Sequence, residues 1–483
     1  MKKRSITSNY IYNLIYQLVI ILIPLLTTPY LTRVLGATKL GIYSYTYSIV
    51  TIFFLLAALG INTYGQREIA YVQDDIKKRS KIFFELLIIR IFSTLFSAIV
   101  LFIFSNITSS YSLYYQIFLM YVISNLFDIT WLYQGLENFK TVSIRSLIIK
   151  VIYFISIFVF IKNENDIYIY ILLYSISTII TNLSFWININ KIIEKVNYKN
   201  LNIKKHIKTV ITFFIPQIAS LIYTVLDKTM IGLIVPEIES VYFYEQASYI
   251  DKTILMLITT IGTVMISKVA YAFEKNNIKQ VKEYMIQVIN FVWLSGSALS
   301  FGVCGIIKNL VPWFYGDGCI QIINLVYIMS PLIIIIGLNN VIGIQYLVPT
   351  KQQNKYIFAV VCGAIINFVL NLIFINLFSS IGAGISTVLA EFLILLIELY
   401  YVRDMIKLQE VFKPAFKYII IGLIMFLATY FSGYIFGPVF YGTILQIIIG
   451  FIIYIILLII TKDKFFSNHI LNYLKNIKIN KRG

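Results

Sequence analysis

Residues 209–265 read TVITFFIPQIASLIYTVLDKTMIGLIVPEIESVYFYEQASYIDKTILMLITTIGTVM, which indicates two hydrophobic helices joined by a short acidic loop. Asp227 and Lys228 interrupt the first helix, and Asp251 and Lys252 stand near the start of the second. An ionisable residue at membrane depth costs about 2.5–3.5 kcal/mol on insertion scales, so such residues usually face a bundle interior or a water-filled cavity. Adjacent Asp227 and Lys228 point about 100° apart around a helix, so they do not simply neutralise each other. The stretch therefore predicts a polar site within a membrane protein.

The composition of the whole chain agrees with this interpretation. Of the 483 residues, 59% are hydrophobic and 13% are charged, and a soluble protein carries about twice that charged fraction. The apolar residues form blocks of about 20, the length that crosses a bilayer as a helix. The 3 cysteines and 2 histidines have no ligand spacing, so the sequence predicts neither a disulfide framework nor a metal site. Both histidines, His206 and His469, fall in basic segments that are expected to be a loop and the tail. We expect an all-α, polytopic membrane protein.

Fourteen transmembrane helices are predicted, which places both termini on one side of the membrane. Most of the 40 lysines and arginines fall in segments on that side, which is therefore cytoplasmic by the positive-inside rule. The outer loops are too short for a catalytic domain, so we expect a transporter and no enzyme. The predicted spans are about residues 10–31, 40–61, 82–104, 113–134, 144–161, 167–189, 209–234, 248–267, 284–307, 320–347, 356–376, 380–402, 415–436 and 439–461. Pro24 and Pro29 are expected to break the first span, and Pro331 is expected to break the tenth.

An internal repeat relates the opening stretch to the start of the chain. Leu35-Gly36 followed by residues 41–49 resembles Ile231-Gly232 followed by residues 241–250. An offset of about 200 residues predicts two parallel six-helix lobes, related by a pseudo-twofold axis along the membrane normal, as in secondary transporters. We expect these lobes at residues 1–208 and 209–414, with helices 13 and 14 and a basic cytoplasmic tail in residues 415–483. The seam between the lobes would then hold the charged residues of spans 1, 7 and 8.

Several motifs together resemble a known family. They are Pro29–Gly36 with Gly41-Ile-Tyr43, Leu59–Ala70, Trp131–Glu137, Asp166, Asp227–Gly232 and Asn367–Thr387. As a set they are similar to the bacterial polysaccharide repeat-unit flippases (Wzx type), whose superfamily includes multidrug extruders and peptidoglycan-precursor flippases. The resemblance covers spans 1–12.

The resemblance implies both a fold and an activity. A two-lobed bundle would move undecaprenyl-pyrophosphate-linked oligosaccharide repeat units from the inner to the outer leaflet of the bacterial cytoplasmic membrane by alternating access. The product would serve the biosynthesis of O-antigen, capsule or exopolysaccharide. Helices 13 and 14 would flank a lateral opening for the lipid tail. The implied partners are membrane lipids, a polysaccharide polymerase and chain-length machinery, and no nucleic acid is expected.

Four cations are candidates for binding the pyrophosphate in a partly dehydrated cavity: Arg33, Arg90, Lys228 and Lys252. We place Lys228 and Arg33 at the centre of this site. Arg33 and Lys252 lie near helix ends, so the alternative for both is snorkelling to the membrane surface.

Three acids accompany these cations: Asp227, Asp251 and Glu391. They are either counter-ions of the empty cavity or carriers of a coupling H⁺ or Na⁺, and the sequence leaves both roles open. No other cofactor and no metal is expected. Glu85, Asp128 and Glu398 are expected near the inner surface.

Other functions compete with flipping. A multidrug or cation extruder of the same fold is the main alternative, although its cavity should be acidic. Another lipid-linked precursor, of the peptidoglycan or teichoic type, is a second. A membrane polymerase or glycosyltransferase would need a long outer loop, and a channel would need a filter motif, and the sequence has neither.

Overall fold

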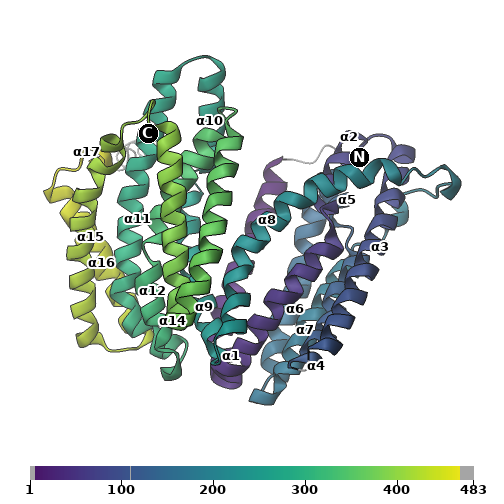
Figure 1. Ribbon diagram of the computed structural model, residues 1–483, viewed down its shortest axis with the longest axis horizontal. Helices are drawn as coiled ribbons and strands as arrows, with labels where there is room; N and C mark the ends of the chain where they lie inside the picture. Colours follow the sequence, from purple (N-terminus) through teal and green to yellow (C-terminus); the bar gives the residue numbers. More distant parts are fainter. Residues whose placement is uncertain (1–5, 109, 261, 468–483) are drawn as a thin grey trace, which may run out of the picture. The chain divides into compact units, whose positions relative to one another are not determined.

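The computed structural model describes residues 6–108, 110–260 and 262–467, and these residues form helices without a β-strand (Figure 1). The predicted all-α class is thereby confirmed. The basic N-terminal residues Lys2, Lys3 and Arg4 and most of the predicted basic tail, residues 468–483, lie outside the described residues. The chain divides into two compact units, Met1–Tyr242 and Phe243–Gly483. The lobe boundaries expected from the repeat stay a prediction.

The first unit is built on three long helices with shorter ones between them. Its elements are α1 (Ile6–Ala58), α2 (Ile61–Tyr71), α3 (Ile76–Ile107), α4 (Ser112–Ile123), η1 (Ser124–Phe127), α5 (Thr130–Gly135), α6 (Phe139–Phe160), η2 (Glu164–Asp166), α7 (Ile167–Ser184), η3 (Ile189–Lys191), η4 (Tyr198–Asn200) and α8 (Lys204–Ile234).

The boundary between the two units falls inside α9 (Glu239–Thr259), after Tyr242. The further elements of the second unit are α10 (Gly262–Glu274), α11 (Ile278–Phe314), η5 (Asp317–Cys319), α12 (Gln321–Met329), α13 (Leu332–Asn339), the π-helix η6 (Asn340–Leu347), α14 (Gln353–Val402), α15 (Leu408–Phe436), α16 (Phe440–Ile460) and α17 (Lys464–Phe466).

Within the described residues, eight helices are long and apolar enough to cross a membrane, or nine if the bent pair α12–α13 with η6 counts as one span. The chain is therefore a multi-pass membrane protein. Two of these helices, α1 and α14, have a sharp kink inside, at Gly36 (φ 76°) and Ser379 (φ 54°). A straight helix of 50 residues would measure about 75 Å, more than twice a bilayer core of about 30 Å. Each kink falls between two predicted spans, while the count of fourteen stays a prediction.

The prolines act differently from one another. Pro331 stands at the break between α12 and α13, where the chain bends by 44°, as the sequence predicts. Pro24 and Pro29 were expected to break the first span, yet α1 continues through both of them and kinks at Gly36 instead. A proline removes one backbone hydrogen bond, whereas a glycine adopts a positive φ without a steric penalty, so Gly36 is the position at which the chain turns.

The core of the first unit positions its polar residues. Trp131, on α5, is fully buried and stacks on Phe83 of α3 with ring centroids 5.6 Å apart. On α2, Gly65 approaches the same indole so closely that an added Cβ would lie 2.7 Å from Trp131 Cε3. Because Gly65 has no side chain, α2 packs directly on α5, and this contact places α2 beside the polar groups of α3 and of the segment that precedes α5.

Candidate functional site

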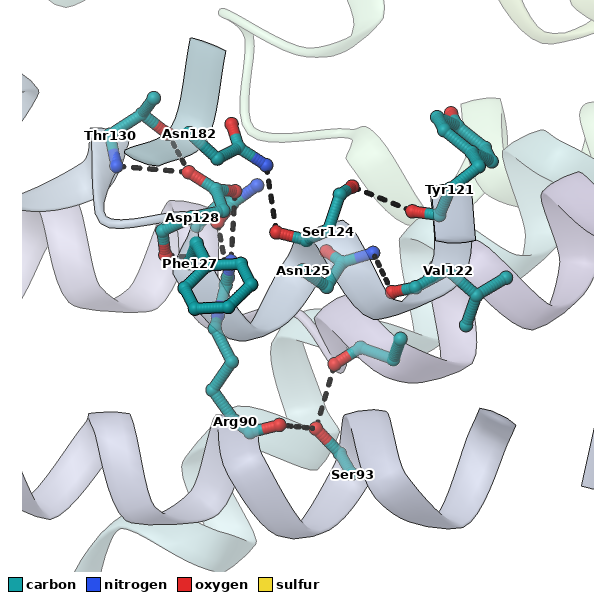
Figure 2. Close-up of polar contacts among 12 residues, drawn as sticks. Arg90, Ser93, Tyr121, Val122, Ser124, Asn125, Phe127, Asp128, Thr130 and Asn182 are labelled. Atoms are coloured by element: carbon teal, nitrogen blue, oxygen red, sulfur yellow. Dashed lines mark hydrogen bonds and ion pairs between the residues drawn. The ribbon is translucent and has the colours of Figure 1, made fainter. Parts of the chain in front are cut away.

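A buried ion pair joins α3 to the residues between η1 and α5 (Figure 2). Arg90 of α3 is fully buried, and its Nη1 donates to Asp128 Oδ2 at 2.8 Å and to the Asp128 carbonyl at 3.0 Å. Its Nη2 donates to Asn62 Oδ1 on α2. Asp128 Oδ1 accepts from the Thr130 amide at 2.9 Å and from the Thr130 hydroxyl at 2.6 Å. Both charged groups therefore have protein partners.

This pair stabilises a break in the helical backbone between α4 and α5. Between α4 and α5 the chain leaves the helical path at Asp128 (φ −76°, ψ 106°), which frees carbonyl groups that water would satisfy in a soluble protein. Asn182 of α7 donates to the Ser124 carbonyl at 2.9 Å, and Trp186 Nε1 donates to the Phe127 carbonyl at 2.8 Å. Figure 2 shows Asn182 and Arg90 approaching the break from different helices. Arg90, Asn182 and Trp186 thus donate hydrogen bonds to the backbone carbonyl groups that the break leaves free.

Among the predicted cations, Arg90 is fully buried and is paired with the carboxylate of Asp128. Its guanidinium is bonded on two sides, and a pyrophosphate would have to compete with Asp128 for it. The expectation that Asp128 is an interfacial residue did not foresee this pair. The partners are 38 residues apart in sequence, so no local pattern indicates their contact.

A second polar cluster joins α2, α3 and the start of α8. Glu85 is fully buried and accepts from the Asn202 amide at 2.7 Å, while its Oε2 lies 2.8 Å from His206 Nε2 and 3.1 Å from Lys205 Nζ. Tyr64 Oη lies 2.7 Å from His206 Nδ1. Because a carboxylate only accepts, His206 Nε2–H donates to Glu85, and the hydrogen bond between Nδ1 and the Tyr64 hydroxyl holds the other side of the ring. The sequence placed His206 in a basic loop, and the structure buries it.

The residues predicted at the lobe seam include Arg33, Asp227 and Lys228, all in the first unit. Arg33 is exposed, and its Nη1 donates to the Pro29 carbonyl at 2.8 Å. On α8, Asp227 is buried (5% exposed) and Lys228 is half-buried.

One turn of helix further on, α8 packs tightly against α1. Ser48 and Thr229 share a hydrogen bond of 2.9 Å, and Gly232 contacts the ring of Tyr45. The structure thus brings α1 and α8, which the predicted repeat relates to each other, into contact within the first unit.

The other predicted acids lie in the second unit. Asp251 of α9 is 5% exposed and neither of its carboxylate oxygens has a hydrogen-bond partner among the described residues, while the adjacent Lys252 is exposed. Glu391 of α14 accepts from Asn339 Nδ2 at 2.7 Å. Two turns along α14, Glu398 is also fully buried, and its carboxylate oxygens are without hydrogen-bond partners in the described part of the chain. The sequence analysis expected Glu398 near the inner surface of the membrane and gave it no role in the site, so this buried acid is one that it did not single out.

Tyrosines of the first unit form a cluster that the sequence did not single out. Tyr47 and Tyr174 share a hydrogen bond of 2.9 Å, and Tyr121 stacks on Phe54 with ring centroids 4.3 Å apart. The rings come from α1, α4, α6 and α7, and further members are Tyr43, Tyr153 and Tyr170. With 37 tyrosines in the chain, composition alone gives no signal for these particular ones.

A large apolar groove occurs in the second unit, between α11, α15 and α16. Its volume is about 760 Å³, and Ala298, Gly302, Thr429 and Gly450 are among the small residues that line it. Small side chains at these positions leave room for a hydrocarbon chain between helices that otherwise carry bulky residues. The helices α15 and α16 correspond to the predicted spans 13 and 14, which the resemblance places beside the opening for the lipid tail.

Just beyond the end of α16, hydrogen bonds to Asp463 fix the position of the chain. Asp463 accepts from Lys417 Nζ at 2.6 Å and from the Phe466 amide at 2.7 Å, and the Tyr418 hydroxyl lies 3.2 Å from its Oδ2. Burial raises the pKa of Asp463, but the hydrogen bonds from Lys417 and Phe466 outweigh it and hold this pKa below its usual value of 3.8. The carboxylate is therefore ionised at neutral pH. No group of three or more possible metal ligands occurs in the described ranges.

Comparison with known proteins places the chain in a family. Residues 6–266 match the family model described as polysaccharide biosynthesis protein. A relative named "Putative O-antigen transporter" from Escherichia coli (strain K12) is 24% identical over 83% of this chain and 98% of its own length. A relative with the same name from Shigella dysenteriae is 22% identical over 79% of this chain and 96% of its own.

Solved structures show the same fold. A lipid II flippase, MurJ, in an inward closed conformation superposes with a TM-score of 0.74 at 19% identity, over 95% of this chain and 99% of that one. An inward-facing multidrug resistance transporter of the MATE family gives a TM-score of 0.61 at 11% identity, over 84% of this chain and 95% of that one. The relatives are transporters and flippases, which confirms the expectation of a transport protein that is not an enzyme. The chain belongs to the polysaccharide biosynthesis protein family of membrane transporters, as its resemblance to the Wzx-type flippases indicated.

Proposed function

We propose that this protein flips undecaprenyl-pyrophosphate-linked oligosaccharide repeat units from the inner to the outer leaflet of the bacterial cytoplasmic membrane, for surface polysaccharide synthesis. The observation that carries the proposal is the family match, extended by two relatives named for O-antigen transport that align over nearly their whole length. A fold shared with a lipid II flippase supports it, because lipid II is also a lipid-linked saccharide. In this proposal the chain crosses the membrane fourteen times as two six-helix lobes with two further helices, and both termini are cytoplasmic.

The substrate has three chemically distinct parts, and the chain offers groups for each. Arg33, Lys228 and Lys252, with Arg90 where Asp128 releases it, would offset the desolvation of the pyrophosphate. The apolar groove between α11, α15 and α16 has the lining that a polyprenyl chain requires. The tyrosine cluster of the first unit offers ring faces and hydroxyl groups to the sugars.

The buried acids supply the simplest means of coupling. Asp227, Asp251 and Glu391 are each at most 6% exposed. Neither carboxylate oxygen of Asp251 has a hydrogen-bond partner among the described residues, and an uncompensated buried carboxylate is strongly disfavoured. A proton or Na⁺ bound at such a group would remove this penalty, and its release on one side of the membrane would favour one state of an alternating-access cycle. As counter-ions, the same acids would keep the empty cation site neutral.

Deletion and complementation test the proposed activity. A strain that lacks the gene should accumulate lipid-linked repeat units in the inner leaflet and should lose surface polysaccharide, and the wild-type gene should restore both. Normal display in the deletion strain, with hypersensitivity to organic cations instead, would contradict flipping and would support the extruder. Release of the repeat units without any polymer would instead point to loss of a polymerase partner.

The cation site has its own test. Arg33→Ala, Lys228→Ala and the double variant should reach the membrane and should reduce surface polysaccharide, the double variant most strongly. Lys308→Ala is the matched control, because Lys308 is an exposed cation that contacts the hydroxyls of Tyr430 and Tyr434 and is not part of the proposed site. Normal display by all three site variants would remove Arg33 and Lys228 from the proposed mechanism.

A further inference from the structure

A basic pocket lies in the first unit, between the start of α3 and the segment that joins α7 to α8. Its volume is about 310 Å³. Lys77 and Lys81 line it from α3, and Lys195 lines it from the connecting segment. Glu194 is the one acidic residue among the described residues on its wall, and Asn197 and Asn200 add amide groups. The pocket therefore has a surplus of positive charge.

Glu194 offsets part of the charge of the three lysines, and two other carboxylates near the pocket are paired with lysines outside it. Asp75, which caps α3, pairs with Lys78 at 3.3 Å. Glu85 pairs with Lys205 at 3.1 Å. The ammonium groups of the three pocket lysines are thus available to an anion that enters from solvent.

Buried hydrogen bonds hold both walls of the pocket in place. Arg79, 6% exposed, donates from Nε and Nη2 to the Ile192 carbonyl at 3.1 and 2.6 Å. Ser80 Oγ, also buried, accepts from the Glu194 amide at 2.8 Å, and Glu85 accepts from the Asn202 amide at 2.7 Å. The segment that carries Lys195 is therefore fixed to α3 at each end. A pocket that is already formed loses little conformational entropy when it binds a ligand.

Aromatic side chains beside the pocket indicate at which level of the membrane it lies. Tyr198, between Asn197 and Asn200 in sequence, is 67% exposed, and its ring lies 5.7 Å from that of Phe84, one turn beyond Lys81 on α3. Exposed tyrosines beside the end of a membrane helix are typical of the lipid headgroup level. The distribution of lysine and arginine predicts that this end faces the cytoplasm, where the leaflet carries anionic lipids.

We propose that this pocket binds the headgroup phosphate of an anionic phospholipid of the phosphatidylglycerol class. The three lysines would contact the phosphate. The two asparagines would accept hydrogen bonds from the glycerol hydroxyls through their amide oxygens and would donate to them through their NH2 groups. A zwitterionic headgroup carries an ammonium group of its own, which the same lysines repel. The site uses none of the residues proposed for the pyrophosphate, so it stands independently of the transported substrate.

Binding of a short-chain lipid tests the proposal. The purified full-length protein in neutral detergent would be titrated with dioctanoyl-phosphatidylglycerol and, separately, with dioctanoyl-phosphatidylcholine, and complexes would be counted by native mass spectrometry. We expect preferential binding of phosphatidylglycerol. The variant Lys77→Gln/Lys81→Gln/Lys195→Gln should bind it about a hundredfold more weakly, at about fivefold for each lysine removed near an anionic lipid. The control Lys208→Gln/Lys279→Gln/Lys413→Gln removes the same charge from exposed lysines elsewhere and should bind as the wild type does.

Four outcomes would overturn the proposal. Equal weakening in the control would show attraction by net charge alone. Equal binding of the two lipids would exclude recognition of an anionic headgroup. Complete competition by inorganic phosphate at the lipid's own concentration would assign the pocket to a free anion. If the triple variant unfolds at a lower temperature than the wild type in the absence of lipid, Lys195→Gln alone decides, because Lys195 is exposed on the connecting segment, and an unchanged affinity in this variant would refute the site.

Discussion

Removal of one member of the Arg90–Asp128 pair should destabilise the protein more than removal of both members. Asp128→Asn keeps an oxygen for the two hydrogen bonds from Thr130, but it leaves a fully buried guanidinium without a counter-ion. Arginine cannot lose its proton in a protein, so this charge persists. Breaking a buried pair in this way costs about 3–5 kcal/mol.

The reverse change should be milder. In Arg90→Met the carboxylate of Asp128 keeps its hydrogen bonds to Thr130, and it can take up a proton to become neutral. The double variant Arg90→Met/Asp128→Asn contains neither charge and should recover most of the lost stability, since neutral replacements of a buried ion pair are often well tolerated. The unfolding temperatures in detergent should therefore fall in the order wild type, double variant, Arg90→Met, Asp128→Asn.

The same four proteins separate a structural role of Arg90 from a role in transport. Surface polysaccharide would be measured in cells in which each variant reaches the membrane in equal amount. If Arg90 serves only to hold the break at Asp128, the double variant should display polysaccharide normally. A stable double variant without display would assign Arg90 to the substrate. A double variant no more stable than Asp128→Asn would refute the argument that an unpaired charge causes the loss.

Three further predictions concern other parts of the chain. Asp463→Asn should lower the unfolding temperature at pH 7, and its difference from the wild type should shrink as the pH falls below about 4, because a carboxyl group with a lowered folded-state pKa stabilises the fold only while it is ionised. Gly65→Ala should cost about 1–3 kcal/mol through its clash with Trp131, whereas Gly318→Ala, with open space around it, should leave the unfolding temperature unchanged. Ala298→Trp should fill the apolar groove and reduce surface polysaccharide, whereas Leu427→Trp, at an exposed position on α15 outside the groove, should not. Normal display by Ala298→Trp would exclude the groove from transport.

Local sequence patterns predicted much of the fold. The apolar blocks predicted a helical, multi-pass membrane protein, and the set of motifs around Gly36, Trp131 and Gly232 pointed to the family that the comparisons then confirmed. Pro331 marked a true bend. The candidate site could be predicted less well from the sequence. Arg33, Lys228 and Lys252 could be selected only as charges at membrane depth, and their role stays a prediction.

The sequence by itself determined whether each segment lies in lipid or in water. Hydrophobicity and charge can be read from neighbouring residues without knowing which helix packs against them. Only the tertiary structure decided which polar groups satisfy one another. Nothing local in the sequence around Asp128, His206 or Glu398 indicates that these side chains are buried, yet all three are buried. Arg90 pairs with Asp128 across a separation of 38 residues in sequence, and Glu85 pairs with His206 across a separation of 121 residues. Such pairs form when helices pack, since a charge or a free carbonyl removed from water must find a partner wherever the fold brings one within hydrogen-bond distance.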